Sequence, residues 1–395
     1  MSRQLFRLAQ QVVQQIKDHG FQAYIVGGAV RDLILDRAVD DIDIATSAHP
    51  DDIMNIFSKV IPTGIEHGTV MVRHQHESFE VTTFRTESNY SDFRRPDKVD
   101  FVTNLNEDLA RRDFTMNAIA MDQSLQLVDP YQGRQAIEEK IIRTVGDPRD
   151  RFLEDPLRMM RAIRFQAQLG FSIDSQALTA ITENGSLLAK IAVERVAMEW
   201  EKMLKGSFFE QAQKSLLTTK LINHLPLFSK DLKTVDIFRD IDKRFSSFAE
   251  FVAYMSLKSA EQSVASWVKE WKLSNRIKKD SKLLEQLIVT YRQESVEWVV
   301  YQLPAHLIVP FSNLCCTIEN ETVTEKAIDQ TKANLSIQTR KELAINGTDI
   351  ISWFPNKEKG AWLQESLLQV EKAVVEGKLS NTKNEIREWL TNDNK

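Results

Sequence analysis

Hydrophobic and polar residues alternate in short runs over the first third of the chain, and after residue 150 the pattern takes a helical period. Alternation, or a short apolar run between turn residues, predicts β-strands at 24–26, 41–45, 68–73, 79–84 and 125–129. Apolar residues that recur every three or four positions predict helices at 187–204, 248–270, 281–303 and 384–391. The predicted fold class is α+β: a mixed sheet with helices over residues 1–142, followed by an all-helical remainder.

Two aspartates share one face of the second predicted strand. Polar and apolar residues alternate through Asp41-Ile42-Asp43-Ile44, and residues i and i+2 of a strand project on the same side. We expect the carboxylates of Asp41 and Asp43 to lie together, about 6–7 Å apart along the strand. Such a pair can hold hard divalent cations, although a solvated strand edge is the commoner reason for it.

A glycine turn precedes these aspartates. Gly27-Gly28 follows the first apolar run and opens a helix, so free N–H groups at the helix start can meet phosphate oxygens. A Gly-Gly pair alone is usually only a turn. Because the turn and the two carboxylates stand within twenty residues of one another, the combination predicts nucleotidyl transfer.

These motifs resemble those of a known family. Residues 27–32 with Asp41-Ile42-Asp43 are similar to the head domain of polymerase-β-type nucleotidyltransferases, and more narrowly to bacterial-type (class II) tRNA CCA-adding enzymes and their relatives, the bacterial poly(A) polymerases. The resemblance continues, in the family's order, through Arg111-Arg112-Asp113-Phe114-Thr115-Met116-Asn117-Ala118, Glu154-Asp155-Pro156-Leu157-Arg158, Arg161, Arg164 and Glu194-Arg195-Val196. It covers residues 24–200, about half the chain, and little beyond residue 210.

The resemblance implies a domain plan and an activity. It implies a catalytic head at 1–142, a helical neck with base recognition at 143–208, a helical body at 209–310 and a helical, tRNA-binding tail at 311–395. The expected reaction is template-independent addition of C, C and A to the 3′ end of tRNA from CTP and ATP, with release of pyrophosphate. The tRNA is expected to be recognised at its 3′ end, acceptor stem and elbow, by shape and backbone charge.

The head residues acquire roles from the same resemblance and from their chemistry. Asp41 and Asp43 are the expected catalytic residues and the ligands of two Mg²⁺ ions, one activating the attacking 3′-hydroxyl and one neutralising the leaving pyrophosphate. Gly28 and Arg31 are expected to bind the triphosphate, by N–H groups and by a charge-assisted hydrogen bond. A third metal carboxylate is left open; the candidates are Glu80 and Asp113.

Asp155 and Arg158 are expected to bind the nucleotide and choose its base. Proline is favoured in the first turn of a helix, so a helix that starts near Asp155 or Pro156 places the two side chains on adjacent turns. Aspartate accepts from the amino group of cytosine or adenine, whereas guanine or uracil would leave it unpaired. In the family this pair acts as a protein template. The alternative is an ordinary helical ion pair.

Three further arginines are expected to bind the nucleotide. Steps of three residues drift by about 60° on a helix of 3.6 residues per turn, so Arg158, Arg161 and Arg164 cannot all face the base. Arg161 and Arg164 are expected to reach phosphate or to fix the helix against the head. Arg112 is expected to contact the nucleotide at the junction of head and neck, with a structural ion pair as the alternative.

The polar segment 85–97 predicts a mobile loop, because it is charged and ends in Pro96-Asp97. The resemblance links a flexible loop here to addition of the terminal A, and it leaves open full CCA addition and A-addition alone. A bacterial poly(A) polymerase is disfavoured, since the segment lacks the basic and apolar character of that branch. A non-catalytic RNA-binding module is disfavoured by the two intact aspartates.

Composition adds a contrast between the two parts of the chain. The net charge of −5 argues mildly against a nucleic-acid partner, but residues 1–165 hold 17 Arg and 4 Lys whereas residues 166–395 hold 7 Arg and 23 Lys. Arginine suits fixed phosphate and base geometry, and the lysines suit either an RNA backbone or an ordinary solvated surface. With no signal peptide or membrane span predicted, we expect a soluble cytoplasmic protein without a membrane partner; the oligomeric state is left open.

Overall fold

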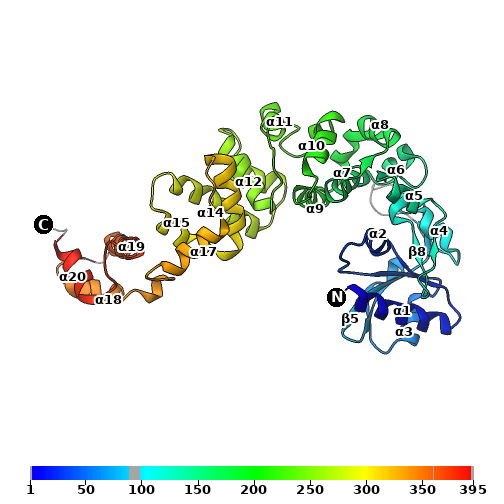
Figure 1. Cartoon of the computed structure of the whole chain (residues 1–395), viewed down its shortest axis with the longest axis horizontal. Coiled ribbons are helices and arrows are strands. Elements are labelled where there is room, and N and C mark those ends of the chain that lie inside the picture. Colours follow the sequence, from blue (N-terminus) through cyan, green and yellow to red (C-terminus); the bar gives the residue numbers. More distant parts are fainter. Residues whose placement is uncertain (1, 89–97, 359, 393–395) are drawn as a thin grey trace. The chain divides into compact units, whose positions relative to one another are not determined.

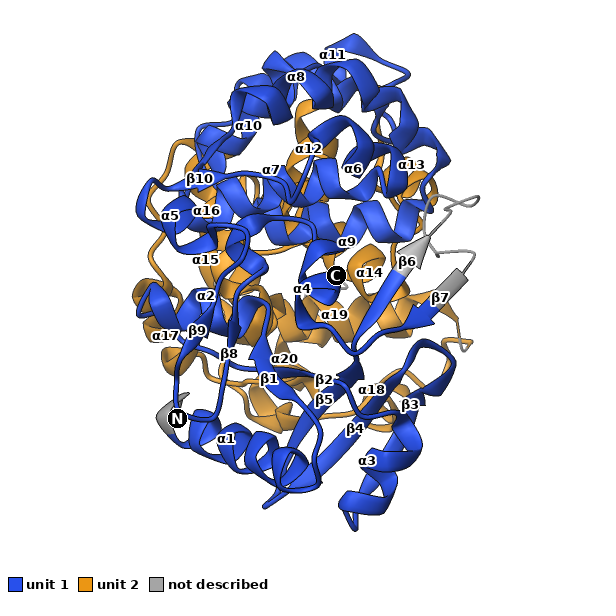
Figure 2. Cartoon of the chain, turned by 90° about the vertical axis from the view of Figure 1, so that its right-hand side faces the viewer, with its two compact units in different colours: residues 1–244 blue, residues 245–395 orange. Residues whose placement is uncertain are grey.

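The computed structural model describes residues 2–88, 98–358 and 360–392. The chain folds as two compact units, residues 1–244 and residues 245–395, which Figure 1 colours along the sequence and Figure 2 colours by unit. The predicted α+β class is confirmed, because a mixed sheet near the N-terminus is followed by a largely helical remainder. The boundary at 244–245 lies inside the predicted body, and the division into four domains stays a prediction.

In the described part of unit 1, seven strands form one mixed sheet in the order β3-β4-β5-β2-β1-β8-β9. The strands are β1 (Ala23–Val26), β2 (Asp43–Thr46), β3 (Val60–Gly64), β4 (Thr69–His74), β5 (Glu77–Thr83), β8 (Ala120–Met121) and β9 (Leu127–Val128). Strands β2 and β5 pair in parallel, and the other pairs are antiparallel. The sequence predicted five of these strands and missed β3 and β8.

The second strand begins later than predicted. It starts at Asp43, which pairs with Val26, the last residue of β1, so residues before Asp43 have no partner in this ladder. Asp41 therefore precedes the strand, and its predicted place within a strand 41–45 is wrong. The alternation nevertheless extends outward, since Asp41 and Asp43 are exposed while Ile42 and Ile44 are buried.

Helices cover both faces of the sheet. They are α1 (Ser2–Asp18), α2 (Gly28–Ile34), α3 (Pro50–Ile56), α4 (Leu105–Ala110) and α5 (Gly133–Glu138). Helices α1 and α3 pack on one face (Figure 1). On the other face, Val26 and Ala45 share a buried cluster with Leu105 and Leu109 of α4. Asp43 lies beside Val26 and two residues before Ala45, so its side chain projects on the α4 side.

The segment predicted as a loop contains paired strands. Strands β6 (Arg85–Ser88) and β7 (Lys98–Phe101) form a two-stranded antiparallel ladder. The loop prediction is therefore wrong for residues 85–88, whose backbone pairs with residues 98–101 despite their polar sequence. Residues 89–97, the rest of the predicted loop, lie outside the described residues.

The remainder of unit 1 is helical apart from one short pair of parallel strands, so the prediction of an all-helical remainder is wrong at residues 172–173. Its elements are α6 (Pro148–Glu154), α7 (Leu157–Leu169), α8 (Ser175–Asn184), α9 (Val193–Leu204), α10 (Phe209–Thr218), α11 (Leu232–Arg239) and the parallel pair β10 (Ile141–Ile142) and β11 (Ser172–Ile173). Helix α7 packs against α9 and α10. The predicted helix 187–204 starts only at Val193, because a 3₁₀ turn (Gly185–Lys190) and the extended Ile191 precede it.

Unit 2 is helical throughout its described residues. The helices are α12 (Phe248–Lys258), α13 (Val264–Glu270), α14 (Asn275–Tyr291), α15 (Val296–Gln302), α16 (Ile308–Leu314), a π turn (Cys315–Glu319), α17 (Glu325–Asn334), α18 (Gly347–Trp353), α19 (Ala361–Val375) and α20 (Lys383–Asn392). The predicted helices 248–270 and 281–303 are each divided in two. The side chains of Ser263 and Ser295 cap the second helix of each pair, which explains why the chain breaks there.

Within the described residues, no single helix is long and apolar enough to cross a membrane. One pair of helices bent by 113°, Val296–Gln302 with Ala305–Glu319, meets that criterion by length and composition alone. Residues of this pair, such as Val299 and Leu314, are buried in unit 2, so its apolar character is used in packing.

Glu250 is a buried carboxylate at the start of α12. The residue is 1% exposed, and it accepts hydrogen bonds from the backbone N–H of Ser246 at 2.8 Å and from the Ser246 hydroxyl at 2.5 Å. Burial raises its pKa to about 7 from 4.5. The folded chain therefore binds this proton more tightly than the unfolded chain does, and the contribution of Glu250 to stability falls as the pH rises from 4.5 to about 7.

Replacing Glu250 with glutamine is expected to remove the loss of stability that ionisation of Glu250 causes as the pH rises. Relative to wild type, the free energy of unfolding of Glu250→Gln should gain up to about 3 kcal/mol between pH 4.5 and pH 8. Denaturant unfolding followed by tryptophan fluorescence suits the measurement, since six of the seven tryptophans lie in residues 245–395. Glu297→Gln, at an exposed position of α15, is the control. A Glu250→Gln curve parallel to wild type across this range would contradict the prediction.

Candidate active site

A pocket of about 440 Å³ lies in unit 1, where the start of α2, the strand β2 and the helices α7 and α9 approach one another. Its volume is in the range usual for small-molecule sites. The lining residues are Gly27, Gly28, Arg31, Asp43, Arg111, Arg112, Asp113, Asn117, Asp155, Leu157, Arg158, Arg161, Arg164, Phe165 and Arg195. Among these described residues seven arginines face three aspartates, so the pocket suits a polyanionic ligand.

Carboxylates gather at one side of this pocket. Asp43 stands opposite Glu80 of the neighbouring strand, and the charge of Asp41 also acts on it. Although the residue as a whole is exposed, partial loss of hydration in the pocket raises the pKa of Asp43 to about 6, with further increases from Glu80 and Asp41 and an opposing effect of Arg112. A divalent cation would relieve this repulsion, and oxygen donors of this kind suit Mg²⁺.

The carboxylates do not form a closed ligand set in the structure. Within residues 2–88, 98–358 and 360–392, no three His, Cys, Asp or Glu side chains lie close enough together to hold a metal ion. Asp41 does not line the pocket, whereas Asp43 does. The donor type and the raised pKa of Asp43 fit a divalent cation, and the expected two Mg²⁺ ions stay a prediction.

The glycine turn brings the backbone against Arg112. Gly27 has φ of 75° and caps α2, which starts at Gly28 as predicted. A Cβ on Gly27 would lie 3.2 Å from Nη1 of Arg112 and 3.8 Å from Oδ2 of Asp43. Arg112 also bonds to Asp108 at 3.3 Å, and burial lowers its pKa. Its Nε has no hydrogen-bond partner among the described residues, so Arg112 is both an ion-pair partner and a donor beside the turn.

Arg31 is held in the pocket by three different groups. Its guanidinium donates to Asn117 at 2.7 Å and to Asp32 at 2.7 and 3.0 Å. It also lies 5.1 Å from the ring centre of Phe165. These contacts fix a cation close to the start of α2, where the resemblance expects phosphate.

Asp113 is committed to a structural network. Arg161 donates to one of its oxygens at 2.5 and 2.8 Å, and Asn117 donates to the other at 3.0 Å. Although burial opposes ionisation, these partners hold the pKa of Asp113 well below its usual value. Of the two candidates for a third metal carboxylate, the geometry therefore favours Glu80, because it lies opposite Asp43 and Asp113 is already paired.

Asp155 and Arg158 line the same pocket but are held by different partners. Asp155 follows α6 as its C-cap, accepts from the N–H of Leu157 at 3.1 Å and pairs with Arg195 at 2.9 Å. It thus directly precedes Pro156, the N-cap of α7, which begins at Leu157, so the prediction of a helix start near Asp155 or Pro156 is confirmed. Arg158 pairs with Glu154 at 2.5 Å. Asp155 and Arg158 therefore have separate ion-pair partners and do not form the helical ion pair that was the alternative.

The arginines of α7 fan out, as their spacing predicts. Arg161 binds Asp113, and Arg164 pairs with Glu199 of α9 at 2.5 Å. Arg164 also lies 3.7 Å from the ring centre of Phe165. Arg161 therefore joins α7 to the segment after α4, whereas Arg164 joins α7 to α9.

The chain is similar to known proteins, both to family models and to full-length relatives. A family model for the poly A polymerase head domain matches residues 23–143, one for the probable RNA and SrmB-binding site of polymerase A matches residues 170–232, and one for a putative tRNA nucleotidyltransferase domain 2 matches residues 241–390. A CCA-adding enzyme of Geobacillus sp. (strain WCH70) is 44% identical over 98% of this chain and 97% of its own length. The chain belongs to the family of CCA-adding enzymes. The predicted enzyme class, tRNA nucleotidyltransferase, is confirmed.

Other members of the family agree. A CCA-adding enzyme of Oceanobacillus iheyensis is 40% identical over 98% of this chain and 97% of its own length. The crystal structure of the Bacillus stearothermophilus CCA-adding enzyme in complex with CTP is similar at a TM-score of 0.87 and 38% identity, over 98% of this chain and 97% of that chain. The resemblance stated from the motifs of residues 24–200 thus extends over nearly the whole chain.

The structure adds residues that the sequence did not single out as site residues. Arg195 and Glu154 hold the predicted base-selecting pair, and both stand within the motifs, so a signal for them existed. Glu199, four residues after Arg195 on α9, follows from helical spacing. Asp108 binds Arg111 and Arg112 but lies outside every motif, and only the fold reveals it.

Gly27→Ala is expected to damage both the fold and the site. At φ 75° and ψ −140° the backbone conformation is essentially restricted to glycine, so an added side chain costs about 1–3 kcal/mol, and the new Cβ would lie 3.2 Å from Arg112. We expect nucleotide incorporation to fall at least about tenfold in the folded variant, because Arg112 must move. Gly20→Ala is a matched control: its φ is 89°, and nothing lies within 4 Å of a Cβ there. Equal loss of activity in both variants would show that backbone strain alone is responsible.

Proposed function

We propose that this chain adds C, C and A to the 3′ end of tRNA without a nucleic-acid template, using CTP and ATP and releasing pyrophosphate. The observation that carries the proposal is the pocket itself, in which a glycine turn, seven arginines and Asp43 stand together in a chain 44% identical to a CCA-adding enzyme. The tRNA is the substrate and CTP and ATP are the nucleotide donors. Contacts to the tRNA acceptor stem and elbow are assigned to the helical part of the chain.

The phosphate side of the pocket is the start of α2. The first N–H groups of a helix have no intrahelical acceptor, so those at Gly28 can bind oxygens of the triphosphate. Arg31 and Arg112 flank them and add charge-assisted hydrogen bonds. The buried Nε of Arg112 is a donor that the described residues leave unsatisfied, which is consistent with a ligand at this point.

The carboxylates define where the chemistry occurs. Asp41 and Asp43, with Glu80 beside Asp43, would hold two Mg²⁺ ions. Bound there, the ions would lower the pKa of the tRNA 3′-hydroxyl and neutralise charge on the departing pyrophosphate. The residues themselves place the triphosphate: Arg31 and Arg112 draw its oxygens toward the face on which Asp43 projects.

The base side of the pocket is the end of α6 and the start of α7. Asp155 can accept from the amino group of cytosine or adenine, and Arg158 can donate to a ring nitrogen or a carbonyl oxygen. Arg195 and Glu154 orient these two side chains by ion pairs at 2.9 and 2.5 Å. Asp155 would keep its ion pair with Arg195, but a base with a carbonyl in place of the amino group would leave the lone pair that faces the base without a donor, which costs about 1–3 kcal/mol.

The test uses three tRNA transcripts, ending at the discriminator base, at C and at CC. Each is incubated with the full chain, Mg²⁺ and labelled CTP, ATP or both, and products are resolved at single-nucleotide length. The proposal predicts that all three converge on CCA and stop there. Extension of only the CC-ended transcript by one A would replace it with A-addition alone, and long A ladders on any RNA would replace it with a poly(A) polymerase activity.

A further inference from the structure

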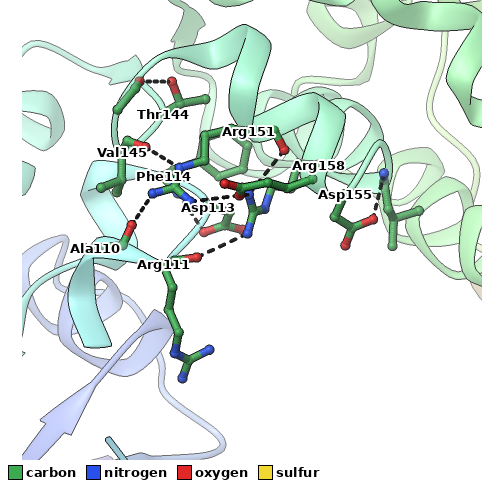
Figure 3. Close-up of polar contacts among 12 residues, drawn as sticks. Ala110, Arg111, Asp113, Phe114, Thr144, Val145, Arg151, Asp155 and Arg158 are labelled. Carbon is green, nitrogen blue, oxygen red and sulfur yellow. Dashed lines mark hydrogen bonds and ion pairs between the residues drawn. The ribbon is translucent and has the colours of Figure 1, made fainter. Parts of the chain in front are cut away.

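Arg151 lies on α6 and does not line the pocket, yet each nitrogen of its guanidinium is bound (Figure 3). Nε donates to the carbonyl of Val145 at 2.6 Å, Nη2 donates to the carbonyl of Ala110, and Nη1 donates to Glu154 at 2.8 Å. The side chain is 16% exposed. Because the guanidinium is planar, three acceptors in different directions fix it in one orientation.

Two of these bonds support the phosphate side of the pocket. Ala110 ends α4 and directly precedes the segment 111–113. Val145 donates its backbone N–H to the carbonyl of Asp113 at 3.2 Å, so it lies against the other end of the same segment. Arg151 therefore binds the residue before segment 111–113 directly and reaches the other end of the segment through Val145; Arg112, which lies beside Gly27, is in the middle of this segment.

The third bond supports the base side. One oxygen of Glu154 accepts both from Arg151 at 2.8 Å and from Arg158 at 2.5 Å. Arg158 is 7% exposed, and it also donates to the carbonyl of Arg151 at 3.2 Å and to the carbonyl of Arg111 at 3.1 Å. Figure 3 shows this chain of contacts running from Ala110 through Arg151 to Arg158. The orientation of Arg158 thus depends on a carboxylate that Arg151 holds in place.

We propose that Arg151 is a positioning residue that aligns the base-selecting residues Asp155 and Arg158 with the phosphate-binding segment 111–113. The inference rests on the proposed function, because base choice is measurable only on an enzyme that adds nucleotides. Correct selection requires that the base-binding residues and the phosphate-binding residues hold the same nucleotide at a fixed distance from each other. Without the Arg151 side chain, Glu154 loses a partner and is held less firmly against Arg158, which keeps its bonds to the carbonyls of Arg151 and Arg111, so a wrong base is rejected less well.

The primary test is Arg151→Met, which keeps the apolar stem and removes the three hydrogen bonds. Single-turnover rates are measured for CTP, ATP, UTP and GTP on the three tRNA transcripts, with melting temperature as a separate readout. We expect the ratio of correct to incorrect incorporation to fall at least about tenfold and the KM for CTP and ATP to rise. Arg149→Met is the matched control, because Arg149 lies on the same helix in an exposed pair with Glu183 and should leave the ratio unchanged.

Two further variants keep the test decisive if Arg151→Met folds poorly. Glu154→Gln preserves shape but weakens the link between Arg151 and Arg158, and it should lower the same ratio. Arg151→Lys keeps the charge but cannot reach three acceptors, so it should not restore wild-type selection. In the double variant Arg151→Met with Glu154→Gln, the loss should be smaller than the product of the single losses, since both changes break one chain of contacts.

Two results would overturn the inference. One is wild-type base selection in a folded Arg151→Met or Glu154→Gln variant. The other is an equal slowing of all four nucleotides together with a lower melting temperature, which would make Arg151 a structural residue only. Failure of the wild-type chain to add C or A to any transcript is a different outcome, because it removes the proposed function itself.

Discussion

Asp43→Asn is expected to reduce incorporation of every nucleotide by about three orders of magnitude or more, and Asp41→Ala should do the same. Cations at these carboxylates would supply several kcal/mol of charge stabilisation to the departing pyrophosphate, and about 4 kcal/mol corresponds to a thousandfold in rate. Single-turnover addition of CMP to a tRNA ending at the discriminator base measures the loss. Asp40→Asn, at an exposed neighbouring position, is the matched control.

Although Asp43→Asn should lose activity, its thermal stability should stay the same or rise. The pKa of Asp43 is raised to about 6 by lost hydration and by Glu80 and Asp41, so at pH 7.5 its charge opposes folding. The melting temperature of Asp43→Asn at pH 7.5, without divalent ions, should therefore equal or exceed that of wild type. Titration with Mn²⁺ should show weaker binding than wild type. Undiminished activity, or unchanged Mn²⁺ binding with a lower melting temperature, would contradict the assignment of Asp43 as a metal ligand.

Asp155→Ala is expected to relax base choice more than it slows the best nucleotide. Removing the carboxylate removes the acceptor for the amino group of cytosine and adenine, so the preference for these bases over guanine and uracil should fall by about tenfold to a hundredfold. Addition of C to the transcript that accepts it fastest should fall less. Rates with each of the four nucleotides, taken on the same tRNA transcript, give the ratio directly.

The control for Asp155→Ala removes a carboxylate from α6, the helix that Asp155 caps, at a residue that does not line the pocket. Asp150 is exposed near the start of α6, and Asp150→Ala should leave both rate and selectivity unchanged. Because Asp155 pairs with Arg195 at 2.9 Å, a loss of melting temperature in Asp155→Ala is compatible with the prediction. Wild-type discrimination in Asp155→Ala would exclude Asp155 as the group that selects the base.

The motifs placed most of the pocket in advance. Gly28, Arg31, Asp43, Arg112 and Asp155 were predicted as site residues, and all line one pocket, together with Arg158, Arg161 and Arg164. Strand and helix periodicity also predicted the order of sheet and helices. Whether a segment forms a strand or a helix depends mainly on residues a few positions apart, so local hydrophobic periodicity can predict it.

The ends of helices and strands, and the pairing of strands distant in the sequence, were predicted less well from the hydrophobic pattern. The sequence extended the second strand to Asp41, but the ladder begins at Asp43, because β1 ends at Val26. It joined α12 to α13, although a serine cap starts α13 separately. The sequence also treated residues 85–88 as loop, whereas pairing with residues 98–101 makes them a strand. In each case a partner distant in the sequence, or a side-chain cap, overrides the local preference.

By itself, then, the sequence determined the α+β class, the membership of the family and most of the residues predicted for the site, which line one pocket. Only the tertiary structure decided which partner each charged side chain has. It set Glu80 opposite Asp43, engaged Asp113 with Arg161, and paired Arg164 with Glu199. The physical reason is that an ion pair forms only between side chains brought within a few ångströms, and residues 48 positions apart reach that distance only through packing of the whole unit.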